Sequence, residues 1–177
     1  MFKEIISMML AAVLTLPCAL TSADPGTESM VFGGAKAVAV LEGSCLQTAV
    51  GYEADTVLNV AGLSRLPALM YVCEAFDKGL VSEDASIVVG DVAAGVGGPT
   101  AFVAAGEKIP ASALIKAAVM ITAGDATYAL AETAAGSATL AEKAIANLLT
   151  ELNIGSGDFT LAGGKPSMTA KEVCALM

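Results

Sequence analysis

Residues 59–80 constrain the fold more than any other stretch, because a helix through them would be apolar on nearly every side. The larger apolar residues recur at three- and four-residue spacing, as on one helix face. They are Leu63, Leu66, Leu69, Met70, Cys73, Phe76 and Leu80. Pro67 lacks an amide hydrogen and is tolerated only in a first turn, so the helix is predicted to begin at Ser64 or Arg65, with Ser64 as N-cap. We expect this helix in the middle of a domain, with Cys73 as a small core residue.

The composition favours one globular domain and argues against several classes of function. Hydrophobic residues make up 55% of the 177 positions and charged residues 15%, so a sizeable core can form. The net charge of −9 disfavours binding to nucleic acid or to anionic membranes. The chain has no His and no Trp, which removes His-based catalysis and argues against a stacking platform for bases. No residue spacing matches a metal site, so neither a metal nor a cofactor is expected.

The first 23 residues have the pattern of a secretory signal peptide. Lys3 supplies the positive start, 5–20 the apolar stretch, and 21–23 a cleavage site of small residues. A buried N-terminal helix is the alternative interpretation of the same pattern. We therefore expect a secreted or extracytoplasmic protein whose mature chain starts with a flexible, polar segment at 24–34.

The cysteines do not form a closed disulfide set. Cys18 lies in the predicted leader, which leaves Cys45, Cys73 and Cys174. An odd number cannot pair completely within one chain, and the sequence leaves the disulfide state of these three open.

The rest of the chain mixes predicted strands and helices, which indicates an α+β domain. Strands are expected at 35–41, 45–50 and 86–89, the first two as a hairpin, and helices at 109–121 and 138–152. The Gly-rich residues 91–105 are predicted to form a loop with tight turns. Leu140 is expected on the buried face of the helix at 138–152.

The segment VAGLSRLPALMYVCEAFDKGLVSED at 60–84 resembles the D-alanyl-D-alanine carboxypeptidases, or low-molecular-weight penicillin-binding proteins, around their Ala-Ser-x-x-Lys motif. In that family the Ser is the acyl-accepting nucleophile and the Lys helps to activate it. Here the Ser position is Gly62 and the Lys position is Arg65. Glycine has no hydroxyl to acylate, and arginine stays protonated and cannot accept a proton.

A second landmark, TAGDATYALAETAAGS at 122–137, resembles the Ser-x-Asn segment of the family and the helix that follows it. The Ser position is Thr122 and the Asn position is Gly124, whereas Asp125 is kept. Asp125 is expected to accept amide hydrogen bonds at the start of that helix, at 126–134. Residues 167–177, SMTAKEVCALM, resemble a later helix of the family, and Ser167 or Thr169 is its expected N-cap. The third motif of the family, Lys-Thr-Gly, does not occur in the sequence.

The resemblance implies a β-lactamase/transpeptidase-like α+β fold over residues 35–177, in incomplete form. We expect mostly its helical part and an N-terminal β-hairpin, without the C-terminal sheet strands that carry Lys-Thr-Gly in the family. A sheet edge would then be bare, so a protein partner that completes it is expected, with a peptidoglycan peptide as another candidate ligand.

The lost motif residues predict a secreted pseudoenzyme of the cell envelope that binds a cell-wall peptide or a partner protein. The alternatives are a serine-type D-Ala-D-Ala carboxypeptidase of peptidoglycan maturation and a truncated product without a role. Ser64 is disfavoured as a substitute nucleophile, because Pro67 stands where its base would be. Arg65 is hypothesised either to fork onto Asp125 or another carboxylate and fill the vacated pocket, or to extend into solvent.

Overall fold

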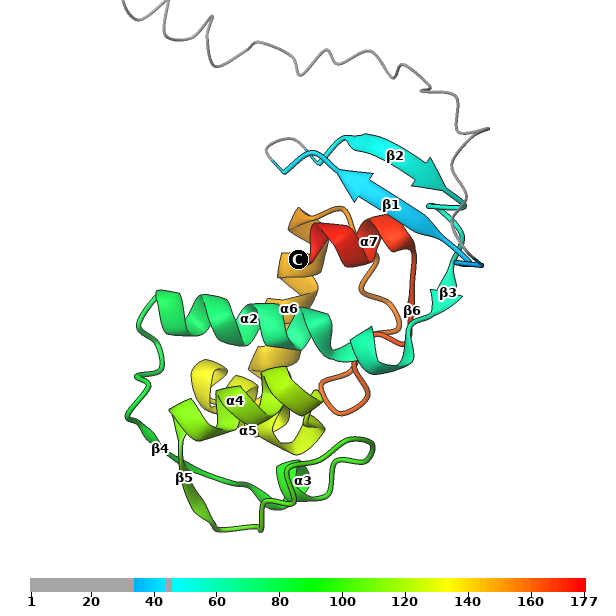
Figure 1. Ribbon diagram of the computed structural model, residues 1–177. Coiled ribbons are helices and arrows are strands. Elements are labelled where there is room, and N and C mark those ends of the chain that lie inside the picture. The colour runs from blue at the N-terminus through cyan, green and yellow to red at the C-terminus, as the bar shows by residue number, and fades with distance from the viewer. Residues whose placement is uncertain (1–33, 44–45) are drawn as a thin grey trace, which may run out of the picture.

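The computed structural model describes residues 34–43 and 46–177, which form helices and short strands (Figure 1). The α+β class predicted from the sequence is confirmed. The predicted leader at 1–23, nearly all of the predicted segment 24–34, and Cys45 lie outside the described residues. Among the described helices, none combines the length and the hydropathy that a membrane span requires.

An antiparallel hairpin opens the described part of the chain, as predicted. It consists of β1 (Val38–Leu41) and β2 (Thr48–Tyr52), with Val38 opposite Tyr52. The second strand begins and ends later than expected, and the register shifts between Val40 and Leu41. The last helix, α7 (Ala170–Ala175), packs against β1, so the two ends of the described chain lie side by side (Figure 1).

The helix at the centre of the domain is α5 (Gly124–Ala135). The sequence instead predicts a central helix within residues 59–80. Every residue of α5 from Gly124 to Ala131 is buried. Three helices surround α5: α2 (Leu66–Asp77), α4 (Ala111–Ile121) and α6 (Ala138–Glu151). Most side chains of α5 are small, which lets neighbouring helices approach its backbone closely.

The buried face of α2 is not the predicted one. Its buried residues are Pro67, Ala68, Val72 and Ala75, which are mostly small. The larger residues of the predicted face are half-buried or exposed, and Cys73 is exposed, so its prediction as a core residue was wrong. The reason is the partner: α2 packs against the Ala-rich α5, and close helix packing places small side chains at the contact.

The start of α2 is built differently from the prediction. A 3₁₀ helix, η2 (Ala61–Arg65), leads directly into α2, and Arg65 occupies the N-cap position. The Ser64 side chain makes no capping hydrogen bond, so its predicted N-cap role was wrong. Pro67 does lie in the first turn, as predicted, where no intrahelical donor is needed.

Two short pairings join segments that the sequence left unconnected. β3 (Leu58–Asn59) pairs with β6 (Ser167–Met168), and β4 (Ser86–Val88) pairs with β5 (Lys108–Pro110). The predicted loop at 91–105 contains a one-turn helix, α3 (Asp91–Ala94). Both β3 and α3 lead into segments that reach Arg65, so these connections position the candidate site.

The last two helices show one wrong and one correct prediction. The buried face of α6 is formed by Ala141, Ile145 and Leu149, whereas Leu140 is exposed. In α7, Thr169 is the N-cap and forms a capping box with Glu172, as predicted for one of the two candidate residues.

Candidate functional site

The four positions that match the family motifs lie on three elements. Gly62 and Arg65 belong to η2, Gly124 is the first residue of α5, and Thr122 is the C-cap of α4 with a left-handed φ of 51°. The structure brings Arg65 and Gly124 into contact. The Thr122 hydroxyl donates to the carbonyl of Ile121, so it is engaged within its own turn.

Arg65 is buried, with 9% of its surface exposed, and its guanidinium joins two distant loops. Nη1 donates to the carbonyl oxygen of Ala162 at 3.0 Å, and Nη2 donates to that of Gly97 at 2.9 Å. These acceptors lie between α6 and β6 and directly after α3, respectively. The guanidinium therefore connects three parts of the chain that meet at the start of α5.

Gly124 leaves the space that this guanidinium occupies. A Cβ at position 124 would lie 2.5 Å from Nη2 and 2.6 Å from Nη1 of Arg65, and in contact with Cζ. Real Cβ atoms do not approach other heavy atoms so closely, so no side chain fits at position 124 while Arg65 keeps this conformation. We call Arg65, Gly97, Gly124 and Ala162 the Arg65 junction.

The electrostatics of the Arg65 junction are unusual for a cation. Burial lowers the pKa of Arg65, and the negative charge of Asp125 opposes that shift. The guanidinium also faces the first residue of a helix, where the backbone dipoles favour anions over cations. An arginine remains charged under these conditions because its intrinsic pKa is so high. Two carbonyl acceptors and the nearby carboxylate thus offset the loss of hydration.

Asp125 does not form the hypothesised fork with Arg65. No ion pair joins them in the described part of the chain, although the charges are close enough to interact. The carboxylate, 1% exposed, accepts the Ala101 amide at 2.9 Å, the Val103 amide at 3.3 Å and the Ala126 amide at 2.8 Å. Asp125 thus accepts one amide at the start of α5, as predicted, but from inside the helix, whose N-cap is Ala123; its other bonds hold a loop.

No hydrogen bond joins the Ser64 hydroxyl to a base in the described part of the chain. Ser64 is engaged through its carbonyl, which accepts the backbone amide of Lys165 at 2.6 Å, and the Lys165 ammonium pairs with Asp158 at 2.6 Å. Among the described residues, no hydrogen bond joins a Ser or Thr hydroxyl to a lysine amine, and the Thr56 hydroxyl, which donates to Glu53, lies in an exposed turn. Ser64 therefore shows no hydrogen bond of the kind that activates a nucleophile.

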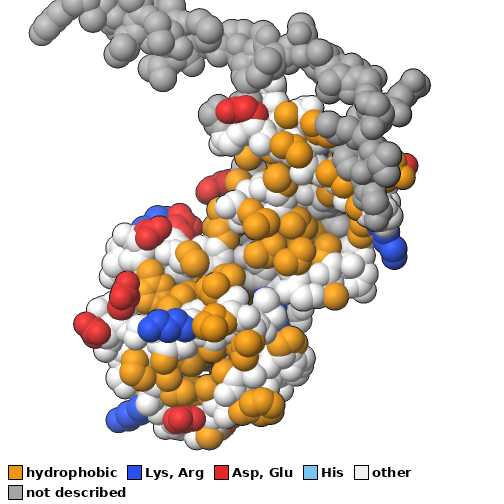
Figure 2. Space-filling view, in the orientation of Figure 1, with side chains coloured by type: hydrophobic (Ala, Val, Ile, Leu, Met, Phe, Trp, Pro, Cys, Tyr) orange, Lys and Arg blue, Asp and Glu red, His pale blue; other side chains and the backbone are white. Residues whose placement is uncertain are grey.

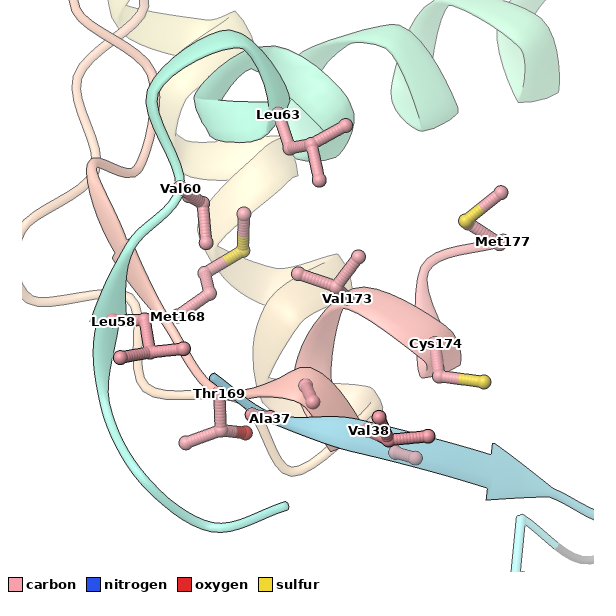
Figure 3. Close-up of a pocket in the computed structure, with 12 residues that line it drawn as sticks. Ala37, Val38, Leu58, Val60, Leu63, Met168, Thr169, Val173, Cys174 and Met177 are labelled. Atoms are coloured by element: carbon pink, nitrogen blue, oxygen red, sulfur yellow. The ribbon is translucent and has the colours of Figure 1, made fainter. Parts of the chain in front are cut away.

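A groove of about 410 Å³ lies beside β1 and is lined almost entirely by apolar side chains. Figure 3 shows Leu58, Val60, Met168 and Val173 around its middle, with Leu63 and Met177 at its rim. Figure 2 shows apolar side chains gathered on the surface in the same region, where α7 passes the start of α2. The sequence did not predict this groove, because its residues come from three stretches, 37–39, 58–63 and 168–177, that lie far apart in the chain. Within the described residues, no cluster of His, Cys, Asp or Glu could hold a metal ion.

Comparison with known proteins places the chain among one group. The profile of the peptidase S11 family, D-alanyl-D-alanine carboxypeptidase, matches residues 34–172. The chain is 24% identical over 138 residues to the D-alanyl-D-alanine carboxypeptidase DacF of Bacillus subtilis, covering 76% of this chain and 36% of the relative. It therefore spans about a third of the length of that relative.

Solved structures agree on the fold. The D-alanyl-D-alanine carboxypeptidase DacD from Francisella tularensis superposes with a TM-score of 0.71 at 22% identity, covering 82% of this chain and 36% of that one. Penicillin binding protein 6B from Escherichia coli gives a TM-score of 0.64 at 22% identity, covering 73% and 44%. The transpeptidase-like fold expected from the resemblance is thereby confirmed over part of those chains.

Proposed function

The chain belongs to the D-alanyl-D-alanine carboxypeptidase family, and we propose that it is a member without hydrolytic activity that works by binding. One observation carries the proposal: the positions of the nucleophile and of its activating lysine hold Gly62 and Arg65. Acyl transfer needs a hydroxyl and a base within hydrogen-bond reach, and these two residues supply neither.

The surroundings of Gly62 and Arg65 indicate whether packing or chemistry accounts for the change. A Cβ at Gly62 would meet no atom within 4 Å, so packing leaves room there for the serine that the family uses. Packing therefore does not explain the missing hydroxyl. The Arg65 guanidinium donates to the carbonyls of Ala162 and Gly97. A cation that stays protonated and is held by these two bonds takes no part in proton transfer.

A fluorescent penicillin tests inactivity, because a penicillin acylates the serine nucleophile of this family. We expect no covalent label on this protein, while a family member with intact Ser-x-x-Lys labels under the same conditions. A stable adduct, located on a serine or threonine by peptide mass spectrometry, would overturn the proposal and favour a serine-type D-Ala-D-Ala carboxypeptidase.

We further propose that the groove beside β1 binds an extended, apolar segment of a second polypeptide. β1 pairs with β2 alone among the described strands, so it offers main-chain groups along its other edge next to the apolar lining. A strand added there gains backbone hydrogen bonds and buries alternate side chains in the groove. A peptidoglycan peptide is the competing occupant, and its polar backbone and carboxylates fit an apolar lining less well.

Single-cysteine variants test this binding in the native host. Cys174 lines the groove, whereas Cys73 is exposed on α2 and lines a different depression, so a thiol-linked photo-crosslinker can be placed at either residue. We expect a discrete protein adduct from Cys174 alone, mapped to a segment with alternating apolar residues. Equal adducts from Cys73, or a glycopeptide adduct, would contradict the proposed occupant.

The proposed location is outside the cytoplasm. It is supported by the signal-peptide pattern at 1–23 and by membership of a family of carboxypeptidases that act on cell-wall peptides. N-terminal sequencing of the protein from its host should give a mature chain starting after Ala23. Recovery of an intact Met1 in the cytoplasmic fraction would contradict it.

A further inference from the structure

We propose that Arg65 and Gly124 form one interlocked unit, in which the guanidinium occupies the volume of any side chain at position 124 and ties the loops at Gly97 and Ala162 together. The unit lies where two of the family motifs meet, but its existence does not depend on the proposed function. It is a statement about packing in the folded chain.

Arg65 can keep its conformation only if position 124 is a glycine. With a Cβ at 124, two guanidinium nitrogens would stand at 2.5 and 2.6 Å, so Arg65 would have to leave. Gly98, with a φ of +89°, also comes close, since a Cβ there would lie 3.5 Å from Nη2. The space around the guanidinium is therefore closed on the side of α5 and on the side of the loop after α3.

The hydrogen bonds explain why Arg65 stays in this space. Its two acceptors are 32 and 97 positions away in sequence, and each carbonyl would otherwise face a partly buried environment without this donor. The Gly124 amide in turn donates to the Pro99 carbonyl at 2.8 Å, which brings the same loop to α5. Moving Arg65 thus breaks contacts in two loops at once.

A double-mutant cycle measures the coupling between Arg65 and Gly124, because the effect of Gly124→Ala on Tm should differ between two backgrounds. In the natural background, Gly124→Ala should lower Tm by about 5–10 °C, because overpacking displaces the guanidinium. In an Arg65→Ala background the space is empty, and the same substitution should leave Tm unchanged or raise it by about 2–3 °C, since alanine favours a helix more than glycine. Equal losses in both backgrounds would overturn the proposal.

Two other glycines serve as matched controls. A Cβ at Gly164 would collide with the Ser64 backbone carbonyl, which truncating Arg65 does not remove, so Gly164→Ala should lower Tm equally in both backgrounds. Gly62→Ala should change Tm little in either, because its surroundings are open. Only position 124 is expected to depend on Arg65.

A chemical probe tests the same inference without an Arg65 variant. Arg65 is the only arginine in the chain, so phenylglyoxal addition reports on one side chain, located by peptide mass spectrometry. We expect the native protein to react at least tenfold more slowly than the urea-unfolded protein, and folded Gly124→Ala to react nearly as fast as the unfolded chain. Rapid modification of the native protein, or slow modification of folded Gly124→Ala, would show that the guanidinium is not held by this packing.

Discussion

Replacing Asp125 with alanine should release the loop at 99–103 from the start of α5 and strongly destabilise the fold. The carboxylate is 1% exposed and accepts three backbone amides, those of Ala101, Val103 and Ala126. After the substitution, the Ala126 amide stays buried without an acceptor, while the two loop amides can reach water only if the loop moves.

The magnitude follows from the bond lengths. Two of the bonds, at 2.9 and 2.8 Å, are short and charge-assisted, and each such bond contributes about 1.5–3 kcal/mol. The Val103 bond at 3.3 Å adds little. Because the loop regains some hydration, we expect a loss of about 3–5 kcal/mol from the free energy of unfolding. Asp125→Asn keeps one acceptor oxygen and should lose about 1–2 kcal/mol.

Urea unfolding followed by far-ultraviolet circular dichroism measures these free energies, and hydrogen exchange by NMR reports on the individual amides. The matched control is Asp91→Asn, an exposed acid in the first turn of α3, which should change stability by less than about 0.5 kcal/mol. The reasoning would be refuted by an Asp125→Ala protein that loses less than about 1 kcal/mol and still protects the amides of Ala101 and Val103.

Three further outcomes follow from contacts elsewhere. The hydrogen bond from Lys165 holds the pKa of Asp158 below its ordinary value. This pair therefore stabilises the fold above about pH 4, and its contribution is lost as pH falls through the lowered pKa. Asp158→Asn should flatten the acid limb of a plot of Tm against pH. Thr169→Ala should cost about 1 kcal/mol in urea unfolding by removing the α7 cap, whereas Ser167→Ala should cost little. Cys73 is exposed, but partial desolvation of its thiol raises its pKa, and the neighbouring carboxylate of Asp77 adds to the shift. The folded protein should therefore react with a thiol reagent more slowly than a cysteine peptide at pH 8, and equal rates would contradict this.

The sequence predicted the elements of the fold better than their packing. The hairpin, α4, α6 and the Thr169 cap follow from local signals such as alternation, helical spacing and capping chemistry. The central place of α5 does not, because an Ala-rich helix shows little contrast between faces. The periodicity of residues 59–80 predicts a buried face of large side chains, whereas the contact between α2 and α5 is made by small ones.

The candidate site divides in the same way. The positions of Gly62, Arg65, Thr122 and Gly124 could be found by matching motifs along the chain. The partners of Arg65 could not, because they are backbone carbonyls, which every residue possesses and no sequence pattern marks. The sequence does show a single arginine, Arg65, and a glycine, Gly124, at the asparagine position. That the two pack together becomes visible only when they are seen close in space.

The pairing of β3 with β6, and the packing of α7 against β1, have a consequence for biosynthesis. Both β1 and β3 receive their docking surface only when residues 167–175 have been synthesised, after α2, α4, α5 and α6 are available to assemble. Until then the nascent hairpin remains undocked, and a chaperone that shields extended apolar segments has its longest opportunity there.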